Sequence, residues 1–150
     1  MAQYFATVRW ERHGETFTDN RYSRAHEWQF DGGVSVPASS SPHVVKVPLS
    51  NPAAVDPEEA FVASLSSCHM LFFLSFAARD GFVVDSYVDE AIGYIEKDDN
   101  GRMAMTRVTL RPKISYAGAS PAADKLAALH ERSHHECYIA NSVTTKVTVE

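Results

Sequence analysis

The hydrophobic and polar positions divide the chain into an N-terminal part of short strands, a long apolar helix and a mixed C-terminal part. Tyr4–Arg12 alternates apolar and polar side chains, as a strand with one buried face does. The pattern predicts two further strands, at Ala25–Phe30 and Val44–Leu49. Between these, Val36–Pro42 is irregular in composition, and we expect the wider segment Ser35–His43 to be a functional loop, either an ordered lid or a mobile one.

The longest apolar stretch predicts a helix from Asp56 to about Arg79. Asp56 offers a capping oxygen, and Pro57 takes a first position that needs no hydrogen-bond donor. The two glutamates that follow place negative charge at the positive end of the helix dipole. Apolar side chains lie all around this helix, so it must be covered on every side. Because one sheet covers one side only, we expect a second copy of the chain to cover the rest, in a homodimer.

The C-terminal part predicts a hairpin, a second helix and a last strand. Phe82–Lys97 and Met103–Tyr116 flank the turn sequence Asp98-Asp-Asn-Gly101. Ser120-Pro121 opens a helix that runs toward His134, and Val143–Val149 closes the chain as a β-branched strand. The resulting order, β-β-β-α-β-β-α-β, lacks the alternation of a doubly wound sheet. We therefore expect an α+β fold in a single domain, residues 1–150.

Charge and hydropathy narrow the classes of partner. A net charge of −5 argues against a nucleic-acid partner, because such a surface is normally basic. The first residues have no basic start followed by an apolar core, so we expect no signal peptide and a cytoplasmic location. The apolar run Ala60–Ala78 is long enough to cross a bilayer. Its polar residues and lack of basic flanks favour a buried helix, so we expect no membrane partner.

Cys68 and Cys137 are the two cysteines of the chain, and they are 69 residues apart. In a chain without export features, such a pair is more often redox-active or catalytic than a structural disulfide. A reactive cysteine must be a thiolate, and Cys68 lies about three turns into its helix, too deep for the helix dipole to help much. A nearby cation is therefore needed. Arg24 and Arg21, which lie in a turn region before a strand, are the candidates, and we favour Arg24.

Glu58 could orient such an arginine through a bidentate contact. Glu58 and Cys68 are ten residues apart, or about 15 Å along a straight helix. One arginine does not easily reach both on the same helix. Either the helix bends, or the carboxylate and the arginine come from the partner subunit, which would make the active site a shared one.

Asp56-Pro-Glu-Glu59, followed by Ser-Ser-Cys68, resembles the Asn-Pro-Glu-Glu/Gln…Ala-Cys segment of the OsmC/Ohr family, the osmotically inducible and organic hydroperoxide resistance proteins. Cys137 precedes the final strand, as the second cysteine of that family does. The resemblance implies an intertwined α+β homodimer of OsmC-like fold with the cysteine helices at its centre. It also implies a thiol-dependent peroxidase that reduces organic hydroperoxides.

Residue by residue, the resemblance makes Cys68 the peroxidatic cysteine, which becomes a sulfenic acid, and Cys137 the resolving cysteine, which condenses with it. Glu58 would orient an arginine that stabilises the Cys68 thiolate. The reductant implied is a lipoylated protein or another dithiol, with no bound cofactor. Aromatic residues around Cys68 in the sequence, such as Phe72, suggest an apolar pocket that favours bulky organic hydroperoxides over hydrogen peroxide.

The same residues allow three other functions. A non-catalytic protein could use the dimer cleft to bind a small apolar ligand. A hydrolase could pair Cys68 with His135 as its base. A zinc site could draw on these two residues together with His69, His134 and Cys137. We expect no metal site, because adjacent helical residues such as Cys68 and His69 point about 100° apart. His134 and His135 near a helix C-terminus are explained as favourable cations there.

Overall fold

The computed structural model describes all residues from 1 to 150. The chain forms two compact units, residues 1–60 and residues 61–150. The expectation of one domain over residues 1–150 stays a prediction.

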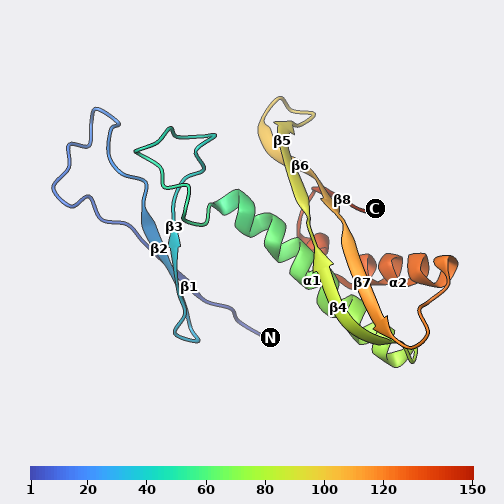
Figure 1. The fold of residues 1–150 in the computed structure, drawn as a ribbon. Coiled ribbons are helices and arrows are strands. Elements are labelled where there is room, and N and C mark those ends of the chain that lie inside the picture. Colours follow the sequence, from blue (N-terminus) through green and yellow to red (C-terminus); the bar gives the residue numbers. More distant parts are fainter. The chain divides into compact units, whose positions relative to one another are not determined.

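The first unit is built on a three-stranded antiparallel sheet in the order β1-β2-β3 (Figure 1). Its strands are β1 (Ala6–Arg9), β2 (His26–Phe30) and β3 (Ser35–Ala38). Trp28 of β2 lies opposite both neighbouring strands, and the turn between β2 and β3 contains Gly33 with φ +87°. A positive φ of this size is one that glycine adopts without steric cost.

Two predictions for this unit are wrong. The predicted loop contains β3, because Asp31-Gly-Gly33 is a tight connection that lets the chain return along β2. The predicted strand Val44–Leu49 consists of turns, in which the Leu49 N–H bonds to the Lys46 carbonyl at 3.1 Å. The β-branched composition of that segment suggested a strand, but no other strand pairs with it.

The long helix α1 spans Pro57–Arg79, as its capping signals predict. The Glu59 N–H donates to Asp56 Oδ1 at 2.8 Å, and the Asp56 N–H donates to Glu59 Oε2 at 3.2 Å. These two bonds form a reciprocal capping box. The helix ends before Gly81, which has φ +86° and donates its N–H to the Ala78 carbonyl at 3.1 Å.

The second unit carries two sheets, and Figure 1 shows β4 running beside β7 and β5 beside β6. One sheet is the antiparallel pair β4-β7, and the other has the order β5-β6-β8, with β8 parallel to β6. The elements after α1 are β4 (Val83–Asp89), β5 (Ile92–Lys97), β6 (Met103–Leu110), β7 (Pro112–Ala117), α2 (Ala123–Glu136), a 3-10 turn at Ala140–Ser142 and β8 (Lys146–Val149). The fold class is α+β, as predicted.

Each arm of the predicted hairpin is divided into two strands, so four strands stand between the helices where two were expected. Asp89 at the end of β4 accepts the Arg111 backbone N–H at 2.6 Å and the hydroxyl hydrogen of Ser66 on α1. Both arms are therefore interrupted at the same level, where Arg111 separates β6 from β7, and they pair with each other on both sides of the interruption. The order observed is β-β-β-α-β-β-β-β-α-β.

The core of the second unit consists of two clusters that follow α1. Phe73, Phe76, Ala77 and Leu129 pack together, with Ile114 of β7 against them. The other cluster is formed by three fully buried side chains, Leu65, Val108 and Leu110. The α1 helix thus contributes to both clusters and is fixed against both sheets.

One side of α1 stays uncovered within a single chain. Leu71 in the middle of the helix is 60% exposed. By length and composition alone, the most apolar window of the helix could cross a membrane, and 28% of that window is buried within the chain. A single copy of the chain therefore leaves apolar helix surface in contact with water.

Candidate active site

The two cysteines come together between α1 and the end of α2. Cys68 is half-buried in the middle of α1, and Cys137 is the fully buried C-cap residue of α2. The side chain of Cys68 is a neighbour of the Cys137 thiol and contributes to the shift of its pKa, and both cysteines are free thiols. The Ala140 N–H donates to Cys137 Sγ at 3.4 Å and holds this sulfur in place.

The environment of Cys137 favours its protonated form. Burial raises the pKa of the Cys137 thiol, and the neighbouring side chain of Cys68 raises it further. The backbone N–H groups of Ala140 and Ile139 oppose this pKa shift only in part. Cys137 is therefore a thiol near neutral pH, and its S–H is available to donate to Cys68. Of the two sulfur atoms, that of Cys68 belongs to the less buried residue.

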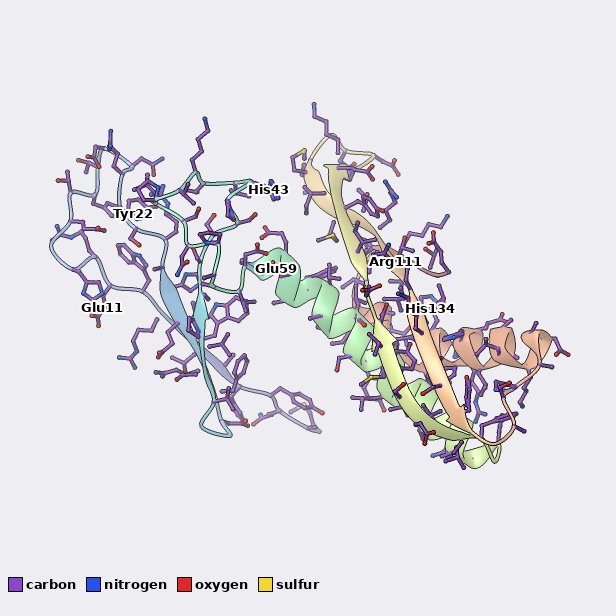
Figure 2. All side chains as sticks on the ribbon, viewed as in Figure 1. Glu11, Tyr22, His43, Glu59, Arg111 and His134 are labelled. Carbon is purple, nitrogen blue, oxygen red and sulfur yellow. The ribbon has the colours of Figure 1, made fainter.

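Arg24, the favoured cation candidate, is held in the connection between β1 and β2. Its Nη1 and Nη2 atoms donate to the Asn20 carbonyl at 3.0 Å and to Asn20 Oδ1 at 2.8 Å, and Nη1 also donates to the Tyr22 carbonyl. The guanidinium carbon lies 3.8 Å from the centre of the Tyr22 ring, labelled in Figure 2. Arg21 is exposed, and its backbone N–H bonds to Asp19. The loop therefore gives Arg24 a defined conformation.

Glu58 in the first turn of α1 has a buried carboxylate oxygen, Oε2, without a hydrogen-bond partner. No ion pair joins Glu58 to Arg24 or to Arg21. A buried carboxylate oxygen without a donor costs free energy. The Oε2 atom of Glu58 is thus available to accept a hydrogen bond from a cationic donor. Its predicted role, and that of Arg24, stay predictions.

A contact between two histidines, the buried His69 and the half-buried His130, is the feature of this region that the sequence did not predict. Nε2 of His69 lies 3.0 Å from Nδ1 of His130, and the two rings are stacked with their centres 5.3 Å apart. The His130 ring also stacks on Phe73 at 4.6 Å. Burial, with smaller contributions from His130 and His134, lowers the pKa of His69 to about 4. A sequence signal existed, since His130 follows Leu126 by four residues on the apolar face of α2.

The two histidines at the end of α2 lie at the surface. His134 and His135 are exposed, and His135 Nδ1 lies 3.1 Å from Glu136 Oε1. No group of three or more histidine, cysteine, aspartate or glutamate side chains lies close enough together to hold a metal ion.

Comparisons with known proteins bear on the whole chain. The family model of OsmC-like proteins matches residues 50–150. An OsmC-like protein of unknown function from Vibrio cholerae is 53% identical and superposes with a TM-score of 0.97, covering 100% of this chain and 99% of that one. A search of curated proteins gives no match.

More distant structures share the fold. An organic hydroperoxide resistance protein from Elizabethkingia anophelis is 18% identical with a TM-score of 0.72, covering 100% of this chain and 96% of that one. The organic hydroperoxide resistance protein OhrB of Bacillus subtilis is 17% identical with a TM-score of 0.67, covering 99% and 97%. At these identities the likeness is one of fold.

Proposed function

The chain belongs to the OsmC-like protein family, and from that premise we propose that it is a thiol-dependent peroxidase that reduces organic hydroperoxides. The observation that supports the proposal is the proximity of Cys137 to Cys68, which is close enough to raise the pKa of the Cys137 thiol. A disulfide needs the two sulfur atoms to approach to about 2.05 Å, and side chains that are already neighbours are well placed for that step. Proteins named for organic hydroperoxide resistance also share this fold.

The proposed reaction has two steps on the protein. The Cys68 thiolate attacks the hydroperoxide, so that an S–O bond forms, the O–O bond breaks and the substrate leaves as an alcohol after taking up a proton. Cys68 is oxidised by two electrons to a sulfenic acid. The Cys137 sulfur then attacks the Cys68 sulfur, the disulfide forms, and the sulfenic oxygen leaves as water with the Cys137 proton. A dithiol, which we propose to be a lipoylated protein, restores both thiols by exchange.

Glu58 and Arg24 have positioning roles in this proposal. The guanidinium of Arg24, favoured over Arg21, stabilises the Cys68 thiolate, and Glu58 orients that guanidinium. The buried Oε2 of Glu58, which lacks a partner, supports the proposal. The carboxylate and the guanidinium would form their pair when two chains assemble.

A homodimer completes the proposal. Leu71 is 60% exposed at the middle of an apolar helix, which supports a second copy of the chain as its cover. The peroxidase would act in the cytoplasm. Apolar side chains near Cys68 on α1, such as half-buried Phe72, favour bulky organic hydroperoxides over hydrogen peroxide.

The decisive experiment counts free thiols in the reduced protein before and after one equivalent of cumene hydroperoxide. The wild type should lose both thiols. Cys137→Ser should stop at a Cys68 sulfenic acid that a dimedone adduct reveals, and Cys68→Ser should keep its remaining thiol. Cumyl alcohol, which has no O–O bond, is the control and should oxidise nothing. If both wild-type thiols survive excess hydroperoxide, the chain is not a peroxidase, and a non-catalytic ligand-binding protein becomes the favoured function.

A further inference from the structure

A pocket of about 530 Å³ opens between α2, β7 and β8 in the second unit. Strands β7 and β8 belong to different sheets, so no ladder of hydrogen bonds closes the space between them. Ile114, Leu126, Val147 and Val149 give the pocket apolar walls. The volume is within the range of about 300–1,000 Å³ that small-molecule sites occupy. Neither cysteine lines the pocket, which is therefore distinct from the thiol pair.

Two side chains in the lining present polar atoms that lack protein partners. The hydroxyl of Tyr116 on β7 is buried and makes no hydrogen bond. His130 on α2 has its Nδ1 atom occupied by His69, which leaves Nε2 as the ring atom open to a ligand. A buried hydroxyl without a partner costs free energy that an acceptor on a bound molecule would recover.

The hydrogen bond between the histidines also decides which atom of His130 carries its proton. His69 Nδ1 is buried without a partner. An unpaired acceptor is tolerated better than an unpaired N–H donor, so we assign the proton of His69 to Nε2, from which it donates to His130 Nδ1. His130 must then carry its own proton on Nε2. Both Tyr116 and His130 thus present donors, and a matching ligand would present an acceptor.

Charges in the lining select against an anionic ligand. Glu131 and Glu150 contribute carboxylates, whereas no lysine or arginine lines the pocket. Burial lowers the pKa of His130 and raises the pKa of Tyr116, so both groups are neutral near pH 7. His134, labelled on α2 in Figure 2, also lines the pocket but is exposed to water.

We propose that the pocket between α2, β7 and β8 is a second binding site, which takes a neutral small molecule with an apolar body and a hydrogen-bond acceptor. Apolar walls bind the body, and the Tyr116 hydroxyl and His130 Nε2–H donate to the acceptor. The site lies within one chain and is independent of the thiol chemistry. If this second site does not exist, the proposal of a peroxidase is unaffected.

The test is a fluorescence titration of the reduced full-length protein with prodan, a neutral naphthalene ketone whose emission reports an apolar environment. Saturable binding of one prodan per chain is expected, and the anionic probe toluidinylnaphthalene sulfonate should bind more weakly. Tyr116→Phe should weaken prodan binding about 3- to 10-fold, since it removes one hydrogen bond. Absence of prodan binding, or tighter binding of the anionic probe, would overturn the proposal.

Two alanines on α2 provide a matched pair for the location of the site. Ala127 and Ala128 are both exposed, but only Ala127 lines the pocket. Ala127→Leu fills space in the pocket and should weaken prodan binding at least ~10-fold, while Ala128→Leu should leave it unchanged. Ala123→Leu, at another lining position, repeats the test at a second place. Equal binding of prodan by all three variants would overturn the proposal. A changed oligomeric state of Ala127→Leu would also overturn it, because the pocket would then be an interface between copies of the chain.

Discussion

Nε2 of His69 lies 3.0 Å from Nδ1 of His130, and this contact joins the residue that follows Cys68 on α1 to the middle of α2. His69 is 1% exposed, and the His130 ring stacks on Phe73. A proton on either ring would place a charge in an apolar core. Burial accordingly lowers the pKa of both histidines.

The free energy of unfolding should therefore fall as the pH drops from about 6.5 to about 4. The pKa of His69 is about 4 in the folded protein, and in the unfolded chain it returns to the ordinary histidine value of 6.5, so within this window the unfolded chain binds a proton that the folded chain does not. The contribution of His69 is fully present above pH 6.5 and is lost toward pH 4. This pKa shift of His69 contributes about 3 kcal/mol to the free energy of unfolding. Urea unfolding at a series of pH values measures it.

His69→Gln separates this histidine from the carboxylates that also titrate in acid. Its amide can still donate to His130 Nδ1 but takes up no proton. The variant should show a flatter dependence of unfolding free energy on pH between 6.5 and 4, with the remaining slope due to His130 and the carboxylates. Parallel curves for the wild type and His69→Gln would contradict the assignment.

The two cysteines should differ in their rates of alkylation. Cys137 is fully buried with a raised pKa, whereas Cys68 is half-buried. Because the thiolate is the species that reacts, iodoacetamide near pH 8 should modify Cys68 at least ~10-fold faster than Cys137. Peptide mass spectrometry after timed quenching gives both rates. Urea-unfolded protein is the control, in which the two rates should converge.

Gly93→Ala should destabilise the fold by about 1–3 kcal/mol through overpacking. A Cβ atom at Gly93 would lie 2.5 Å from both Met105 Sδ and Val62 Cγ2, and the branched valine has little freedom to move away. Gly32→Ala is the matched control, because nothing lies within 4 Å of its Cβ position and its φ is not in the left-handed range. Urea midpoints compare the two. Equal midpoints would mean that β5 and α1 separate easily at this point.

Leu71→Asp should shift the chain from dimer to monomer. Leu71 is 60% exposed on α1, and a carboxylate there would be buried by the proposed partner helix. Val83→Asp on β4, where the valine is 58% exposed, is the control and should leave the dimer intact. Sedimentation equilibrium measures the association constant. A wild-type monomer would remove the dimer from the proposal.

Glu58→Gln should slow the loss of the Cys68 thiol to cumene hydroperoxide by about 10- to 100-fold, the cost of weakening one charge-assisted hydrogen bond. Glu59→Gln is the neighbouring control, since Glu59 accepts the Asp56 N–H in the capping box and an amide oxygen can do the same. Stopped-flow kinetics under single-turnover conditions measure both variants. If Glu59→Gln is as slow as Glu58→Gln, the effect belongs to the helix end and not to the orientation of an arginine.

The sequence by itself determined the features that depend on neighbours a few residues away. Asp56 and Pro57 define the start of α1, and Gly81 its end, because capping involves only atoms within one turn. The turn at Gly101, with φ +76°, likewise follows from its own residues. Val44–Leu49 shows the limit of such reasoning, since β-branched side chains make a strand only where another strand pairs with them.

Tertiary structure alone decided which distant residues meet. Whether Ser35–Ala38 is a strand depends on its pairing with β2, and the two hairpin arms are divided where Asp89 accepts the Arg111 N–H. The contact between Cys68 and Cys137 spans 69 residues. No local pattern encodes such a contact, because it arises from the packing of α1 and α2 onto a common core. The sequence therefore determined which residues could carry the chemistry, and packing decided which of them lie together.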